Sequence, residues 1–138
     1  ERNVMVARHH AEQAGVAVTY RHALPEDLTA EAETFDIVLS LEVVEHVADV
    51  GAFLRAVGRL VKPGGLMVIG TLNRTPQSYV KAIVGAEYVL RWLPRGTHDW
   101  AKFVRPDEVH RHAAPLGFAP VEIKGVSLNP LTFRWSVS

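Results

Sequence analysis

The stretch Phe35-Asp-Ile-Val-Leu-Ser-Leu-Glu-Val-Val-Glu-His46 decides the fold, together with Leu60-Val-Lys-Pro-Gly-Gly65 and Leu66-Met-Val-Ile69. The first stretch is an apolar run that ends in two carboxylates and an imidazole. A short helix, a Pro-Gly-Gly turn and a second apolar run come after it. Buried strands that alternate with helices are typical of an open parallel α/β sheet, which binds its ligands at the carboxyl ends of the strands.

The rest of the chain continues this alternation. Apolar residues at helical spacing predict a helix that carries Val50, Phe53, Leu54, Val57 and Leu60 on one face. Further helices are predicted over Arg2–Ala14, ended by Gly15, and over 106–114, while 23–34 is predicted to be a polar connection containing Pro25. Strands are predicted over 16–20, 35–39, 66–72, 118–126 and 131–137. The strand 35–39 is apolar almost throughout, as expected when helices cover both faces of its sheet.

Residues 74–100 form a stretch too long for an ordinary loop between a strand and a helix. We expect an insertion here, partly helical between 78 and 93. The whole chain, residues 1–138, is predicted to form one domain.

Composition excludes several classes of function. The 138 residues carry a formal net charge of zero, so no electrostatic attraction favours nucleic acid. The chain contains no cysteine, which excludes disulfides, thiolate metal sites and cysteine nucleophiles. No apolar run approaches the roughly 18 residues that span a bilayer. Because the chain begins at Glu1 rather than Met, we expect a fragment of a longer protein.

Several motifs together resemble the ubiquinone-biosynthesis O-methyltransferases, a branch of the class I S-adenosylmethionine (SAM) methyltransferases. The matching pieces are Phe35-Asp-Ile-Val, Leu41-Glu-Val-Val-Glu-His-Val47, Leu60-Val-Lys-Pro-Gly-Gly65, Thr71-Leu-Asn-Arg74, Val84-Gly-Ala-Glu-Tyr-Val-Leu-Arg91 and Leu93-Pro-Arg-Gly-Thr-His-Asp99. The last two are the more specific to this branch. The resemblance implies a Rossmann-like α/β sheet with a helical insertion after the fifth family strand.

Two family features are missing from this sequence. The glycine-rich turn that holds the methionine end of SAM is absent, and so is the acidic residue that binds the ribose hydroxyls. Both are expected upstream of Glu1, so the sheet is predicted to be incomplete at its amino-terminal side. We therefore expect this fragment alone to bind SAM poorly and to be inactive.

Glu42, Glu45 and His46 stand at positions i, i+3 and i+4, which share a face on a helix. Two interpretations remain open for this cluster. It is either a metal site at the sheet edge or a solvated helix start, where glutamates are favoured electrostatically. The resemblance implies that the three residues bind a divalent cation, taken to be magnesium. Ligand chemistry alone fits manganese or zinc at least as well, because imidazole is an unusual magnesium ligand.

The resemblance implies methyl transfer from the SAM sulfonium to a phenol or catechol hydroxyl of a polyprenylated ubiquinone precursor. A phenol has a pKa of about 10, so catalysis has to favour the phenolate. A chelated cation would do this as a Lewis acid, or His46 would act as general base beside Glu45. These roles compete, since a ligating nitrogen cannot also take the proton.

The resemblance also implies positions that contact the cofactor and the lipid. Leu41, Leu24 and Ala23 are the candidate SAM contacts, with plain core packing as the alternative for Leu41. Arg91, Trp92 and Leu93 are the candidates for membrane and substrate access, because aromatic and apolar residues interleaved with cations suit an interfacial element. The alternative is a helix that only packs on the sheet.

These residues predict a SAM-dependent O-methyltransferase in the cytoplasm, peripheral on the inner membrane of a bacterium or on the matrix side in a mitochondrion. Nucleic acid is not an expected partner. Two alternatives remain: another small-molecule SAM methyltransferase, or a noncatalytic α/β module that binds lipid or metal.

Overall fold

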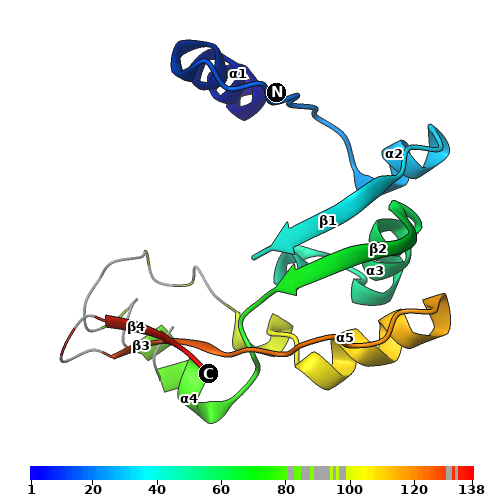
Figure 1. The fold of residues 1–138 in the computed structure, drawn as a ribbon. Helices are drawn as coiled ribbons and strands as arrows, with labels where there is room; N and C mark the ends of the chain where they lie inside the picture. The colour runs from blue at the N-terminus through cyan, green and yellow to red at the C-terminus, as the bar shows by residue number, and fades with distance from the viewer. Residues whose placement is uncertain are drawn as a thin grey trace.

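The computed structural model describes residues 1–80, 83–84, 88, 94, 96, 99–129, 132 and 134–138. Two parallel strands, β1 (Phe35–Leu41) and β2 (Val61–Gly70), lie side by side at its centre, joined through helix α3 (Val50–Arg59) (Figure 1). Ile37 lies opposite Leu66 and Leu41 opposite Gly70. This confirms the predicted parallel α/β arrangement, with β1 two residues longer than expected.

The Lys-Pro-Gly-Gly turn forms a bulge at the start of β2 rather than a break before it. Phe35 pairs with Val61 and Ile37 already pairs with Leu66, so residues 62–65 stand out of the ladder. Gly64 takes a left-handed φ of 78°. A Cβ on Gly65 would lie 2.7 Å from the Asp36 carbonyl oxygen, so only glycine fits at this approach of the two backbones.

The core lies on one side of the β1–β2 sheet, under α3. Leu54 is fully buried and packs in one cluster with Val44, Phe53, Val57 and Val104. The predicted apolar face of this helix is therefore confirmed. Asp49 caps its first turn, because its carboxylate accepts a hydrogen bond of 2.8 Å from the Ala52 N–H.

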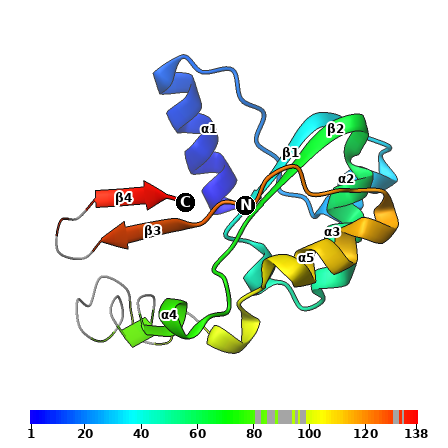
Figure 2. The same cartoon turned by 60° about the horizontal axis from the view of Figure 1, so that its bottom comes forward.

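The other side of β1 is open. Ile37, Leu39 and Leu41 keep 60%, 61% and 58% of their surface exposed. The prediction that helices cover both faces of this strand is wrong for the described residues. α3 and α5 (Pro106–Ala113) pack on each other, and both lie on one side of the strand pair (Figure 2).

The predicted amino-terminal helix is confirmed as α1 (Arg2–Ala14), which ends at Gly15 in the left-handed conformation. The predicted 106–114 helix is confirmed as α5, with Pro106 in its first turn. The stretch 23–34 holds a helix that was not predicted, α2 (Pro25–Ala30). Pro25 starts it, and the Asp27 carboxylate accepts a hydrogen bond of 2.8 Å from the Leu24 N–H.

Two predicted strands are wrong. Residues 16–20 and 118–125 are irregular, and most of their apolar side chains are exposed, with Val18 at 49% and Val121 at 86%. Among the described residues neither segment has a strand beside it to satisfy its backbone, so alternation alone did not make a strand. β3 (Val126–Asn129) and β4 (Arg134–Val137) form a separate antiparallel hairpin instead, far from α2 (Figures 1 and 2).

Short helical pieces link these elements. Among the described residues they include the 3₁₀ helices η1 (Val44–His46), η3 (Trp100–Lys102) and η4 (Ala114–Leu116), and the single turn α4 (Pro76–Ser78). α4 lies in the predicted insertion, of which residues 81–82, 85–87, 89–93, 95 and 97–98 fall outside the described residues.

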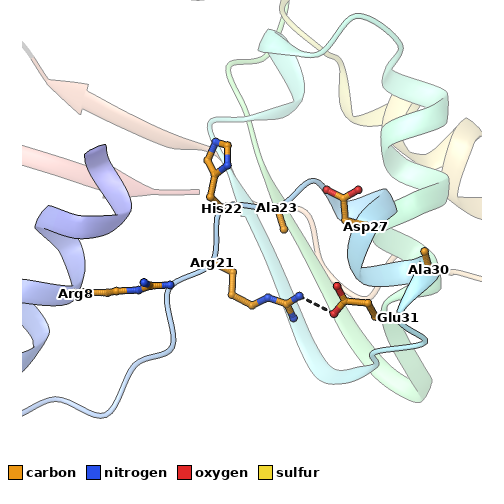
Figure 3. A pocket seen from close by; sticks show the side chains of 7 residues that line it. All are labelled: Arg8, Arg21, His22, Ala23, Asp27, Ala30 and Glu31. Carbon is orange, nitrogen blue, oxygen red and sulfur yellow. Dashed lines mark hydrogen bonds and ion pairs between the residues drawn. The ribbon is translucent and has the colours of Figure 1, made fainter. Parts of the chain in front are cut away.

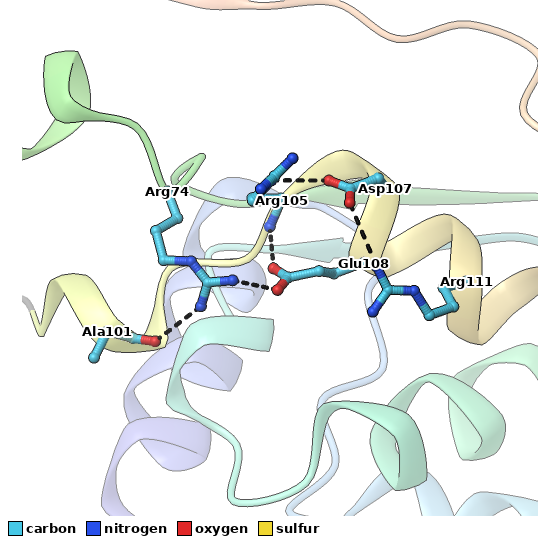
Figure 4. Close-up of polar contacts among 6 residues, drawn as sticks. All are labelled: Arg74, Ala101, Arg105, Asp107, Glu108 and Arg111. Carbon is cyan, nitrogen blue, oxygen red and sulfur yellow. Dashed lines mark hydrogen bonds and ion pairs between the residues drawn. The ribbon is translucent and has the colours of Figure 1, made fainter.

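The chain on the two sides of this insertion is joined by an ion pair. The Arg74 guanidinium contacts the Glu108 carboxylate in the first turn of α5, and it also donates to the Ala101 carbonyl oxygen at 3.3 Å (Figure 4). The second Glu108 oxygen accepts the Arg105 N–H at 2.8 Å. This backbone hydrogen bond, with the nearby Arg74 charge, lowers the pKa of Glu108 below its ordinary value.

The ionised Glu108 carboxylate is therefore expected to stabilise the folded protein, and this stabilisation should be lost in acid. The pKa of Glu108 is lower in the folded state than in the unfolded state. Its contribution to the free energy of unfolding is therefore complete above the unfolded-state pKa of about 4.3, and it is lost as pH falls through the folded-state pKa. Chemical unfolding of wild type and Glu108→Gln should show a difference in unfolding free energy at pH 6 that shrinks below pH 4. A difference that stays constant from pH 6 to pH 3 would contradict this assignment.

Candidate functional site

The carboxyl ends of β1 and β2 meet at one edge of the sheet, where parallel sheets bind ligands. The Glu42 N–H donates to the Gly70 carbonyl oxygen at 2.8 Å, which extends the strand pairing by one step. Glu42 then takes a left-handed φ of 54°, which turns the chain sharply into η1. Val44 enters the core with no exposed surface, and this anchors the turn.

The turn buries the Glu45 carboxylate between the two strand ends. Glu45 is 4% exposed, and its Oε2 accepts a hydrogen bond of 3.0 Å from the Thr71 hydroxyl. Thr71 is the first residue after β2. A buried carboxylate with one hydroxyl donor, placed at this edge, is the arrangement most suited to chemistry in the described part of the chain.

The predicted metal cluster is not assembled in this conformation. Glu42 precedes η1 and has a left-handed φ, so Glu42, Glu45 and His46 do not share a helical face. Glu45 is buried while Glu42 and His46 are exposed. Within the described ranges, no group of three or more His, Cys, Asp and Glu side chains is placed to hold a metal ion. In the conformation described, these three residues therefore do not together form a site for a divalent cation.

The three candidate cofactor contacts lie at two places. Leu41 ends β1 and is exposed. Leu24 and Ala23 precede α2, where Leu24 is 64% exposed and Ala23 lines a shallow hollow of about 620 Å³. Neither Leu24 nor Leu41 is among the residues that line that hollow.

Basic side chains from α1 and from the connection after it, and acidic side chains from α2 and its end, form the walls of this hollow (Figure 3). Arg8 reaches from α1 and donates to the Tyr20 carbonyl oxygen at 2.7 Å. Arg21 donates to Glu31 at 2.6 Å and also contacts Glu33. The hydrogen bonds to these two carboxylates raise the pKa of Arg21 above its ordinary value. The arginines thus hold the connection between α1 and α2 in place.

Arg91, Trp92 and Leu93, the candidates for membrane and substrate access, lie outside the described residues. In the described part of the same stretch, the rings of Tyr79 and Trp100 meet edge to face with centroids 6.2 Å apart. None of the helices in the described residues is long and apolar enough to cross a bilayer.

Thr71 was not singled out as a site residue, although it belongs to the matched motif Thr71-Leu-Asn-Arg74. The strand predicted over 66–72 placed Thr71 inside it, and this end was wrong. β2 stops at Gly70, so the Thr71 hydroxyl lies at the ligand-binding edge. Arg74 was missed for a different reason. Its partners, Ala101 and Glu108, lie 27 and 34 residues further along the chain, and spacing does not predict such contacts.

Comparisons with known proteins show the family to which this chain is related. The family described as "Methyltransferase domain" matches residues 1–69 of the 138. The chain is 56% identical over 137 residues to a ubiquinone biosynthesis O-methyltransferase of Cereibacter sphaeroides, covering 99% of this chain and 56% of that protein. It is 54% identical over 138 residues to the protein of the same name from Roseobacter denitrificans, covering 100% of this chain and 56% of that one.

A third relative with this name, from Azorhizobium caulinodans, is 53% identical over 136 residues, covering 99% of this chain and 54% of that protein. The chain thus spans about half the length of the curated relatives that it matches. The family match covers half of the chain. The chain belongs to the methyltransferase domain family.

Proposed function

We propose that the full-length protein carrying this chain is a SAM-dependent O-methyltransferase that methylates phenol or catechol hydroxyls of polyprenylated ubiquinone precursors. The observation that carries this proposal is the identity of more than half of the residues, over nearly the whole chain, to proteins named for this activity. A Rossmann-like sheet, completed by the part of the relatives that this chain does not span, would supply the rest of the cofactor cleft.

The proposal assigns separate tasks to the residues at the strand edge. SAM supplies a methyl group on a sulfonium sulfur when it is bound. Leu41, Leu24 and Ala23 would contact the cofactor through apolar surface. Glu45, held by Thr71, would orient the phenolic hydroxyl or accept its proton, and His46 on the exposed side of η1 would be the alternative base. Holding the hydroxyl in line with the methyl carbon provides much of the rate enhancement.

Glu45→Gln in the full-length protein should reduce turnover of a demethylated ubiquinol by about 10²–10⁴-fold, the usual contribution of a general acid or base. Gln still accepts the Thr71 hydrogen bond, so the fold should be retained. The measurement is a labelled-SAM assay with single turnover.

Thr71→Val is the matched control, since it removes the hydrogen bond and keeps the carboxylate. It should cost much less than Glu45→Gln. Equal losses in the two variants would show that the contact is structural, and full activity of Glu45→Gln would refute the assignment of Glu45.

Only the family resemblance supports a divalent cation as part of the proposed reaction. If one is required, the strand edge has to rearrange to gather Glu42, Glu45 and His46. We expect EDTA to abolish turnover of the full-length protein and added Mg²⁺ to restore it. Unchanged turnover in EDTA would remove the cation from the mechanism and leave Glu45 or His46 as the proton acceptor.

We also propose a peripheral position on the cytoplasmic face of the inner membrane, because a polyprenylated phenol stays in the bilayer. Trp92 and Leu93, interleaved with Arg91, suit an interfacial element. The double variant Trp92→Ser/Leu93→Ser should bind vesicles containing anionic lipid at least tenfold more weakly than wild type in a sedimentation assay. Binding equal to wild type would exclude these two residues as the anchor.

A further inference from the structure

Two segments far apart in the sequence are joined at the base of the insertion. The Arg74 guanidinium contacts both the Glu108 carboxylate and the Ala101 carbonyl oxygen (Figure 4). The Trp100 indole N–H donates to the Thr75 carbonyl oxygen at 3.1 Å. The chain therefore leaves this place at 74–75 and returns to it at 100–101.

The Arg74–Glu108 pair is the firmest of the ion pairs around the start of α5. The side chains of Arg74 and Glu108 are only 30% and 26% exposed. Asp107 also pairs with Arg105, but these side chains are 52% and 55% exposed, and exposed ion pairs contribute little. Glu108 is fixed further by the Arg105 N–H, and the neighbouring Phe103 is buried in the interior.

The same segment reaches the proposed active site. Thr71, three residues before Arg74, donates to the buried Glu45 carboxylate. Residues 71–74 are thus held at one end by Glu45 and at the other by Glu108. Three residues separate Arg74 from the Thr71–Glu45 contact, and Asn73 lies between the two fixed points.

We propose that Arg74 and Glu108 are positioning residues for the phenolic substrate. Their ion pair fixes the segment after β2 against α5, which sets the place of Thr71, Asn73 and Glu45 at the strand edge. This inference rests on the proposed function. Neither residue touches the reacting atoms, so each acts through the segment 71–74.

The kinetic test compares Glu108→Gln and Arg74→Lys with Asp107→Asn in the full-length protein. The first two remove the charge pair or its forked geometry, and the third removes the two exposed ion pairs that Asp107 makes with Arg105 and Arg111 in the same helix. We expect Glu108→Gln and Arg74→Lys to raise KM for the phenolic substrate about tenfold, since small misplacements are costly. KM for SAM should stay within twofold, and Asp107→Asn should match wild type.

A merely structural role would lower the folded fraction, which reduces the apparent kcat and leaves both KM values unchanged. Unchanged KM for the phenol in both variants would therefore overturn the proposal. So would an equal rise in KM for SAM or in the Asp107→Asn control.

Hydrogen exchange gives a second result that does not depend on activity. Peptides covering 70–76 and 99–105 should exchange several-fold faster in Glu108→Gln and in Arg74→Lys than in Asp107→Asn. Equal exchange in all three variants would refute the inference that the Arg74–Glu108 ion pair fixes this segment, even if the phenol is the substrate. Faster exchange in a protein that does not methylate the phenol would support that inference and refute the proposed function.

Discussion

Burial of one face of α3 against the β1–β2 pair is the constraint on which the rest of the structure depends. Leu54 and Val57 fill the space beneath the sheet, and the same cluster includes Val44 and Val104. Val44 belongs to η1, which carries Glu45, and Val104 belongs to the segment that leads into α5. One core therefore fixes both the strand edge and the helix that holds Arg74. Apolar burial of this kind is non-directional. Close packing of Val44 and Val104 nevertheless fixes the backbone next to them, and this places Glu45 and Glu108 where they form their polar contacts.

The elements that the sequence predicted well are those whose signals are local. The helical face of Val50, Phe53, Leu54 and Val57, the glycine stop at Gly15 and the proline start at Pro106 each depend on a few neighbouring residues. The wrong strands at 16–20 and 118–126 fail for the opposite reason. A strand needs hydrogen bonds from another segment, and the alternation of Val121 and Ile123 with polar residues carries no information about whether that segment is present.

The open face of β1 has the same physical origin. Its continuous apolar run predicts a strand buried on both sides, yet Ile37, Leu39 and Leu41 remain exposed. The apolar residues of a strand indicate that it needs to be buried, but they do not indicate which element packs over it. Among the described residues, these three side chains have no element packed over them, while the chain spans about half the length of the relatives that it matches.

At the strand edge, the spacing of Glu42, Glu45 and His46 predicts a shared helical face that the structure does not have. Spacing of i, i+3 and i+4 gathers three side chains only if the helix starts at the first of them. Glu42 takes a left-handed φ instead, and the helix starts two residues later. That turn separates Glu42 and His46 from Glu45, and it also carries Glu45 inward against Thr71. The departure from helical geometry is thus what creates the buried carboxylate, so one backbone dihedral decides between a three-ligand cluster and a single positioned acid.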